Sequence, residues 1–242
     1  MDGKLLVDNG VTPPNVPSIA PSGCSVGTKQ GFSIIKYTGN GSAATIPHGL
    51  SQTPTLIIKK FMNGTSNWDV WTPLLNSNKR MLLNTNDSEQ STTSYQSVNA
   101  TTFDVHAGNN DDTVNMIAYL WHDVPGLQKF GSYTGNGNAD GPFIELGFRP
   151  AFLITKRTDG GSNDWQIIDD KRSPYNVANT ILKPNETSAE TSHADYATDF
   201  LSNGFKHRTG HIARNGNGQT YIYMAWAEAV SYTHLTLPTT YE

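Results

Sequence analysis

A five-residue motif occurs twice in this chain, and it constrains the fold more than any other feature of the sequence. Residues 37–41 are Tyr-Thr-Gly-Asn-Gly, and residues 133–137 repeat them letter for letter. Each copy opens a segment of about the same length, so the chain is mainly a tandem duplication. Because Asn-Gly accepts positive φ at both central positions of a tight turn, each motif predicts a β-turn.

The two copies also align beyond the motif. Residues 56–60, Leu-Ile-Ile-Lys-Lys, correspond to residues 152–156, Phe-Leu-Ile-Thr-Lys, and Trp121 corresponds to Trp226. The spacing between equivalent residues widens toward the end of each copy, in stretches that are rich in Ser and Asn. Insertions are tolerated in such stretches, which we therefore predict to be surface loops.

The duplication predicts two domains rather than one large domain. The repeats span residues 31–124 and 128–229, after a Pro- and Gly-rich lead-in over residues 1–30 that we expect to be an extended linker. Pro125-Gly126 leaves almost no linker between the repeats, so we expect the two copies to pack against each other or to lie in a fixed relation. A repeat of about 100 residues can bury a working core without a metal or a disulfide.

Short apolar runs between turn signals predict an all-β fold. We predict strands at residues 32–38, 43–47, 55–61, 68–71, 80–83, 95–98, 102–106 and 114–122, and again at 130–134, 151–157, 165–169, 180–182, 199–201, 204–208 and 220–227. Residues 32–38 and 43–47 are expected to pair as a hairpin across Asn40-Gly41. The predicted fold class is all-β, with two tandem antiparallel β-sandwich (jelly-roll-like) domains.

Composition limits the classes of partner. Charged residues make up 16% of the chain, and the net charge of −4 gives no reason to expect nucleic acid or an anionic membrane. No run approaches the ~18 apolar residues of a membrane span, and residues 1–30 lack the basic end and apolar core of a signal peptide. Cys24 is the single cysteine, so it has no intramolecular disulfide partner, and we expect a surface or linker role for it.

The polar residues give no case for catalysis. His207 and His211 are four residues apart, but they lie in a predicted strand and turn with cationic neighbours, so we expect solvated loop histidines. The acid pairs at residues 111–112 and 169–170 are expected to have turn and surface roles. We predict no catalytic residue, no metal ligand and no cofactor.

Aromatic side chains beside Asn- and Gly-rich loops are the best candidates for binding. Two tryptophan pairs recur at equivalent repeat positions, which favours core packing; they are Trp68 with Trp165 and Trp121 with Trp226. Trp71 and Tyr175 are not repeated, and an exposed ring beside Asn and Asp suits stacking on a sugar. We therefore predict Trp71 and Tyr175 as ligand-binding residues.

Residues 230–242 resemble no ordinary protein segment. Their sequence, Val-Ser-Tyr-Thr-His-Leu-Thr-Leu-Pro-Thr-Thr-Tyr-Glu, resembles one reading frame of a transposon sequencing adaptor. We expect this stretch to be an assembly scar and exclude it from predictions about the fold.

Several longer motifs resemble a known family. Besides the repeated pentapeptide, they are residues 129–137, 147–151, 199–206 (Asp-Phe-Leu-Ser-Asn-Gly-Phe-Lys) and 221–228 (Tyr-Ile-Tyr-Met-Ala-Trp-Ala-Glu). Together they resemble the repeat domain DUF7483, which is abundant in tailed phages and accompanies lectin-like β-sandwich modules in tail and tail-fibre proteins. The resemblance covers residues 31–229, as two tandem copies, and is strongest in the second.

This resemblance implies a non-enzymatic structural module of a phage tail or tail fibre, made in the host cytoplasm and located in the virion. The expected partners are other tail proteins and a host-surface glycan. Two alternatives stay open: a bacterial surface adhesin, and a polysaccharide-degrading tail enzyme, which needs two carboxylates roughly 5–10 Å apart in a cleft. The first repeat has residues 46–50 where the second has residues 143–148, so a ligand site can differ between the copies.

Overall fold

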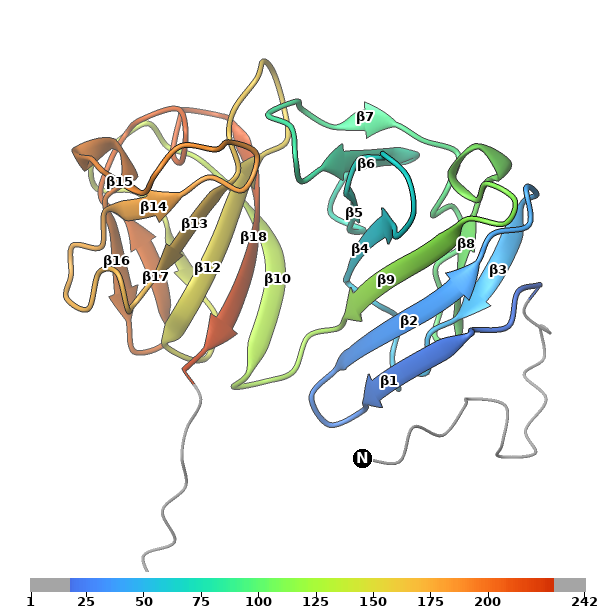
Figure 1. Cartoon of the computed structure of the whole chain (residues 1–242). Helices are drawn as coiled ribbons and strands as arrows, with labels where there is room; N and C mark the ends of the chain where they lie inside the picture. Colours follow the sequence, from blue (N-terminus) through green and yellow to red (C-terminus); the bar gives the residue numbers. More distant parts are fainter. Residues whose placement is uncertain (1–17, 229–242) are drawn as a thin grey trace, which may run out of the picture.

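A computed structural model describes residues 18–228 of the chain (Figure 1). Within these residues the fold is all-β, with antiparallel sheets and two short 3-10 turns, η1 (Ala107–Asn109) and η2 (Ala194–Tyr196). Nowhere in this range is there a helix long and apolar enough to cross a membrane. The predictions for residues 1–17 and 230–242 lie outside the described residues.

The first half of the chain forms a seven-stranded sheet and a two-stranded sheet. The order in the large sheet is β1-β2-β9-β4-β5-β6-β7, and β3 pairs with β8 in the small one. The strands are β1 (Gly23–Gly27), β2 (Phe32–Thr38), β3 (Ala44–Pro47), β4 (Leu56–Phe61), β5 (Asp69–Trp71), β6 (Lys79–Leu82), β7 (Gln90–Ser91), β8 (Thr102–Val105) and β9 (Asn115–Trp121). As its apolar run predicts, β9 is a central strand, between β2 and β4.

The second half forms a six-stranded sheet and a three-stranded sheet. Their orders are β10-β18-β12-β13-β14-β15 and β11-β17-β16. The strands are β10 (Gln128–Thr134), β11 (Phe143–Glu145), β12 (Pro150–Arg157), β13 (Gln166–Asp169), β14 (Thr180–Leu182), β15 (Thr191–Ser192), β16 (Thr198–Leu201), β17 (Gly204–His207) and β18 (Thr220–Ala227).

The two large sheets repeat the same strand order once β1 is set aside. Strand β2 takes the place of β10, β9 that of β18, and β4 to β7 those of β12 to β15. The register repeats as well, since Lys59 faces Asp69 across β4 and β5, and Thr155 faces Gln166 across β12 and β13. The strand order and register of the first half thus recur in the second, and β1 is an addition found in the first half alone among the described residues.

The hairpin predicted across Asn40-Gly41 is wrong. Strand β2 pairs with β1 and β9, whereas β3 pairs with β8 in the other sheet. Gly41 does have a positive φ of 69°, but its turn carries the chain from one sheet to the other. The buried Asn110 amide holds this turn by donating to Asn40 Oδ1 (2.8 Å) and to the Ser42 carbonyl (2.7 Å). Local turn chemistry thus predicted the turn, while burial of the two strands decided their partners.

Two further sequence predictions differ from the structure. Residues 95–98 form no strand, because Tyr95 has a φ of 64°, in the left-handed region, and its ring lies in the first core. The predicted linker over residues 1–30 contains β1, and Ile19 is also buried in the first core. The Ser22 N–H, which donates to the Lys36 carbonyl (2.7 Å), helps to tie this segment to β2.

Each half has its own apolar core between its large and its small sheet. Ile35, Tyr37, Ile46, Phe103 and Leu120 are among the buried residues of the first core. Tyr133, Leu153, Ile168, Phe205 and Tyr221 are among those of the second core. Because residues on alternate positions of β2 and β18 point to these cores, the opposite faces of the large sheets remain to be covered.

A third apolar cluster, which we call the junction cluster, covers those opposite faces and joins the halves. Its buried members are Leu56, Val70, Leu75 and Met81 from the first half and Phe130, Ile154, Trp165, Ile222 and Met224 from the second. The fully buried Trp165 donates its indole N–H to the Leu82 carbonyl of the first half (2.8 Å). The two halves of the chain therefore pack against each other, while their division into two domains stays a prediction.

A buried lysine crosses the same junction. The Lys156 ammonium donates to the Asn86 carbonyl of the first half (3.1 Å) and to the Asn163 carbonyl of the second. Burial lowers the pKa of Lys156 to about 8, although Asp164 and Asp87 act in the opposite direction. The junction is thus held by polar contacts as well as by apolar packing.

Candidate functional site

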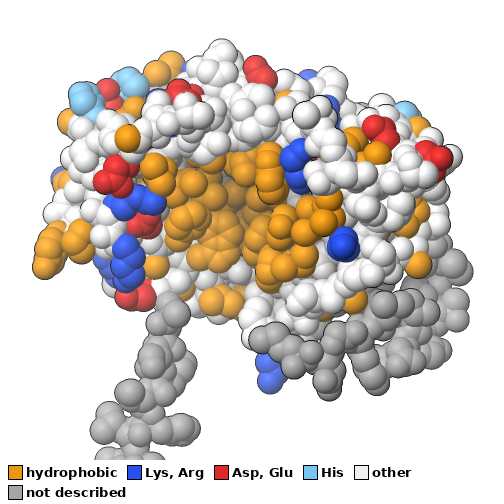
Figure 2. Space-filling view, viewed as in Figure 1, with side chains coloured by type: hydrophobic (Ala, Val, Ile, Leu, Met, Phe, Trp, Pro, Cys, Tyr) orange, Lys and Arg blue, Asp and Glu red, His pale blue; other side chains and the backbone are white. Residues whose placement is uncertain are grey.

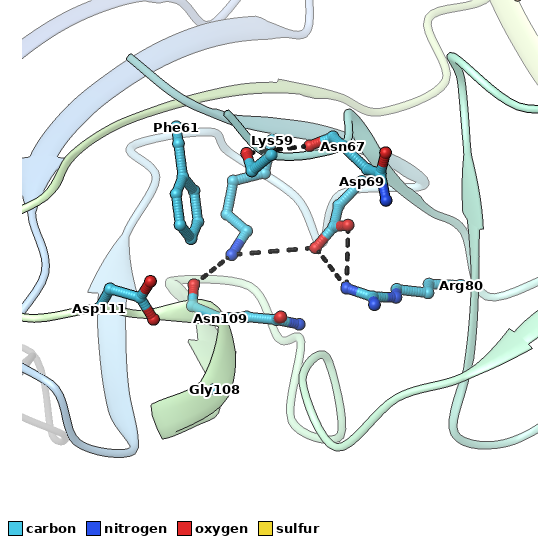
Figure 3. Close-up of a pocket in the computed structure, with 9 residues that line it drawn as sticks. Lys59, Phe61, Asn67, Asp69, Arg80, Gly108, Asn109 and Asp111 are labelled. Carbon is cyan, nitrogen blue, oxygen red and sulfur yellow. Dashed lines mark hydrogen bonds and ion pairs between the residues drawn. The ribbon is translucent and has the colours of Figure 1, made fainter. Parts of the chain in front are cut away.

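A polar pocket of about 230 Å³ opens between the inner face of β4–β6 and the η1 turn (Figure 3). Its lining residues are Lys59, Phe61, Ser66, Asn67, Asp69, Arg80, Gly108, Asn109 and Asp111. The volume lies below the ~300–1,000 Å³ that is usual for drug-sized ligands, so the pocket suits one small group.

Strand alternation places a lysine inside this pocket. On β4, Ile57 points into the first core, and Lys59 two residues later points to the same side. Its side chain is 1% exposed, and the cross-strand partner on β5 is Asp69. Because a buried charge is costly unless it is paired or hydrogen-bonded, the position of Lys59 depends on the polar groups around it.

The Lys59 ammonium has two such partners. It donates to the Asn109 carbonyl (2.5 Å) and lies 4.0 Å from Asp69 Oδ2. Burial lowers the pKa of Lys59 to about 8, and the attraction of Asp69 opposes this shift. Close to neutral pH the lysine is therefore charged, but it loses its proton more readily than a surface lysine does.

A second cation holds the carboxylate. Arg80 Nη1 donates to both Asp69 oxygens, at 2.9 Å and 3.0 Å. With its amide oxygen turned toward the guanidinium, Asn109 accepts from the same Nη1 at 3.0 Å. Lys59, Asp69 and Arg80 thus form a charged chain along the pocket wall, with the exposed Asp111 also lining the pocket.

This arrangement offers both donors and acceptors to a ligand. Arg80 and Asn67 supply N–H groups, Asp111 supplies carboxylate oxygens, and the Phe61 ring gives an apolar wall 5.9 Å from the Lys59 ammonium. Because both Asp69 oxygens accept from Arg80, this carboxylate is more constrained than a free acid or base. The geometry is therefore better suited to hydrogen bonding than to proton transfer.

The second half does not repeat this set of residues. Thr155 and Gln166 occupy the positions of Lys59 and Asp69, as the matching strand registers show. Arg214 stands where the first half has Asn109 and is fully buried, with Nη1 donating to the Thr198 hydroxyl (3.2 Å). Burial lowers the pKa of Arg214 to about 10. The two halves therefore differ at this place.

One histidine prediction is wrong. His207 is fully buried in the second half rather than solvated, with Nε2 2.8 Å from the Tyr133 hydroxyl and Nδ1 3.2 Å from the Thr198 hydroxyl. Burial keeps the pKa of His207 well below its ordinary value. His211 is exposed, as expected. Among the residues that the structure describes, no three His, Cys, Asp or Glu side chains converge as a metal site requires.

The two residues predicted to bind a ligand lie apart from the pocket, in different halves. Trp71 is partly buried against the first core, where it stacks on Tyr95 with ring centroids 5.9 Å apart. Tyr175 is 84% exposed in the loop between β13 and β14. The structure thus offers the Tyr175 ring to solvent and gives most of the Trp71 ring a packing role.

Sequence reasoning missed the residues of the polar pocket. Lys59 stands inside an apolar run, where the equivalent residue of the second repeat is Thr155. A charged residue at an inward position of a strand in one copy alone is a usable signal. The contribution of Asn109 could not be found in this way, because its main-chain carbonyl makes the contact with Lys59.

One family model matches the chain over residues 8–230, and its description is a domain of unknown function, DUF7483. This single match takes in both halves and begins within the predicted lead-in, whereas the sequence motifs predicted one copy of the family for each repeat. No curated protein and no solved structure matches the chain.

Proposed function

Since the chain belongs to the DUF7483 family, whose function is unknown, we propose that it is a non-enzymatic structural module of a phage tail or tail fibre that binds a host-surface glycan. In this proposal the halves are two tandem β-sandwich (jelly-roll-like) domains of a virion protein. The glycan binds in the polar pocket of the first half. The observation that carries the proposal is the set of donors, acceptors and an aromatic wall in that pocket.

Sugars are recognised by groups of this kind. Each sugar hydroxyl both donates and accepts, so a site that mixes N–H donors with carboxylate oxygens can satisfy several hydroxyls at once. Arg80 and Asn67 are such donors and Asp111 is such an acceptor, while Phe61 offers an apolar surface to the C–H face of a ring. A pocket of about 230 Å³ suits one sugar unit at the end or side of a longer chain.

The structural part of the proposal is supported by the junction between the halves. The junction cluster and the Trp165–Leu82 hydrogen bond leave the halves packed rather than loosely tethered. Interfaces of this apolar kind suppress the relative motion that is the default between domains. Such a unit keeps its length and shape, which suits a part of a fibre that must hold a binding site at a fixed distance.

A glycan array with the full chain tests the proposal. We expect binding that falls at least about tenfold in Asn67→Ala and Asp111→Asn, because each removes one polar group of the pocket. Asp112→Asn is the matched control, since Asp112 is also exposed, adjacent in sequence and outside the pocket lining. A folded chain that binds no glycan, or binds equally well in all three variants, would refute the proposed site.

The same array tests the earlier aromatic prediction. Binding that is lost in Tyr175→Ala and kept in Asp111→Asn would move the glycan site to the exposed loop between β13 and β14. Circular dichroism of each variant checks that the fold is kept. Tyr175 makes a suitable probe because its side chain is almost fully exposed, so its removal costs little packing.

A second function, that of a polysaccharide-degrading tail enzyme, is favoured by one observation. Two carboxylates, Asp69 and Asp111, line the same pocket, and glycosidases use such pairs. The bonds from Arg80 to both Asp69 oxygens weigh against it, because they tie up one of the two acids. Release of reducing ends from any glycan that binds on the array, lost in Asp111→Asn, would support the enzyme instead of the non-enzymatic module.

A further inference from the structure

Strand β10 forms an open edge of the six-stranded sheet. In the first half the equivalent strand, β2, is covered by β1, which pairs with it antiparallel from Gly23↔Lys36 to Gly27↔Phe32. In the second half β10 pairs with β18, and on its other side the described residues form only an isolated bridge between Val124 and Gln128. The duplicated fold therefore has a strand beside β2 and, within the described residues, none at the equivalent place beside β10.

The hydrogen bonds at the two ends of β10 show which main-chain groups face this edge. The Leu127 carbonyl accepts from Ala227 N–H, and Gly135 N–H donates to the Gln219 carbonyl, both at 2.8 Å on the β18 side. Because bonding groups alternate along an antiparallel strand, the odd-numbered residues of β10 bond to β18. The even-numbered residues direct their N–H and C=O groups outward.

Some of these outward-facing main-chain groups of β10 already have hydrogen-bond partners. Gln128 exchanges both main-chain bonds with Val124 (3.0 Å each), and Phe130 N–H donates to Asp123 Oδ1 (3.1 Å). No strand of residues 18–228 lies beside the outward groups from the Phe130 carbonyl to Thr134. Ser132, in the middle of this stretch, is exposed.

Two of the other edges of the large sheets are much shorter, and the remaining one, β1, has five residues. Strands β7 and β15 are two residues long, whereas β10 has seven. Natural proteins blunt long edges with charged residues, proline, bulges or a covering segment, because an unpaired edge is a template for another strand. Residues 130–134, Phe-Gly-Ser-Tyr-Thr, contain neither a charge nor a proline.

An apolar surface lies between the halves on the side shown in Figure 2, and it is continuous with the junction cluster. Trp121 stacks on Phe32 with ring centroids 4.8 Å apart and meets Trp226 of the second half at 6.2 Å. The Gln128 side chain donates to the Gln30 carbonyl (3.0 Å), which fixes the start of β10 beside the start of β2. The open edge thus begins next to partly exposed aromatic rings.

We propose that β10 accepts an extended segment of another polypeptide chain as an additional antiparallel strand. Main-chain bonds to Ser132 and Thr134 would hold the segment, in the way that β1 is held on β2. Its apolar or small side chains would lie on alternate positions against the surface between the halves. The internal precedent, β1, has the sequence Gly-Cys-Ser-Val-Gly, so large side chains are not required.

A tethered strand tests this proposal at high effective concentration. Residues 21–28, with Cys24→Ser, are added to the C-terminus of the full chain through a Gly/Ser linker of about 10 residues. We expect amide hydrogen exchange to slow at least about tenfold at Ser132 and Thr134. The Tyr133 amide, which faces β18, is the internal reference. Exchange at Ser132 and Thr134 that is unchanged by the tethered strand would overturn the proposal.

Two variants separate main-chain pairing from side-chain effects. Ser132→Pro removes the outward N–H without removing a bond to β18, so the fold should survive and the protection should be lost. Ser132→Ala keeps the N–H and should keep the protection. Equal protection in both variants would overturn the pairing that we propose.

The untethered chain tests whether the strand added to β10 comes from a different polypeptide or from a second copy of this chain. A monomer at all concentrations in light scattering, together with protection in the tethered chain, supports a separate strand as the occupant. A dimer that Ser132→Pro abolishes would assign the edge to self-pairing of β10 between two copies, and would overturn the proposal of a separate strand.

Discussion

Two buried lysines predict that the protein gains stability as the pH rises from about 8 toward 10. Lys59 is 1% exposed in the polar pocket, and Lys156 is fully buried at the junction of the halves. Burial lowers the pKa of each from 10.5 to about 8. Between these values the folded protein has released both protons, whereas the unfolded chain still holds them.

The sign and the size of the change in the free energy of unfolding follow from this difference in bound protons. Stability rises with pH wherever the unfolded state binds more protons than the folded state, so the gain begins near pH 8 and ends near pH 10.5. A shift from 10.5 to about 8 corresponds to about 3 kcal/mol for each lysine at most. Below pH 8 both buried ammonium groups are charged in the folded protein, and their burial lowers the free energy of unfolding.

Buried tyrosines set the upper limit of this window. Burial raises the pKa of Tyr223 to about 12 and that of Tyr37 further, well above the ordinary value of 10.0. Above pH 10 the unfolded chain releases these protons while the folded protein retains them, so stability falls again. The alkaline side of the stability profile should therefore have a maximum close to pH 10.

Urea unfolding followed by tryptophan fluorescence at pH 7, 8, 9 and 10 measures this profile. We expect a free energy of unfolding that increases by several kcal/mol from pH 7 to its maximum, with a constant dependence on urea. Lys59→Met and Lys156→Met should each remove about half of the increase. A flat or falling profile from pH 8 to 10, or a slope that both variants leave unchanged, would refute the reasoning.

Three substitutions test other parts of the fold by the same urea measurement. Trp165→Phe loses the indole hydrogen bond between the halves and should cost about 1 kcal/mol, because the Leu82 carbonyl keeps a second, longer bond from the Thr85 N–H (3.3 Å). Asn110→Ala frees the Asn40 turn and removes two hydrogen bonds, with an expected cost of about 2–3 kcal/mol; an unchanged midpoint would show that the turn does not need this amide. Gly39→Ala should destabilise more than Gly161→Ala, because the new Cβ at position 39 meets a main-chain oxygen at 2.2 Å, whereas at Gly161 no atom lies within 4 Å.

The positions of strands were predictable because they depend on local patterns. The predicted boundaries of β2, β14 and β18 agree with the structure, since each is an apolar run between turn signals. The partners of strands were harder to predict. The Asn40-Gly41 pair predicted the turn correctly and the hairpin wrongly. The strand that pairs with β2 is β9, which lies near the other end of the first repeat.

The candidate site was less predictable for a related reason. Lys59, Asp69 and Arg80 come together through strand register, and an intervening loop separates each from the next in sequence. Residue type alone could not predict how exposed Trp71 and Tyr175 are. The exposure of Trp71 depends on its packing against Tyr95. The duplication does hold a usable signal, because Lys59 is charged where the other copy has the neutral Thr155.

The junction cluster also limits how the two repeats can be separated by recombination. Separation of the repeats at Pro125-Gly126 would expose Leu56 and Val70 on one side and Ile222 and Met224 on the other, at the expense of a shared core. Neither repeat is therefore a free unit of recombination, and a longer array should grow by whole pairs. The single family match, residues 8–230, likewise takes in both halves.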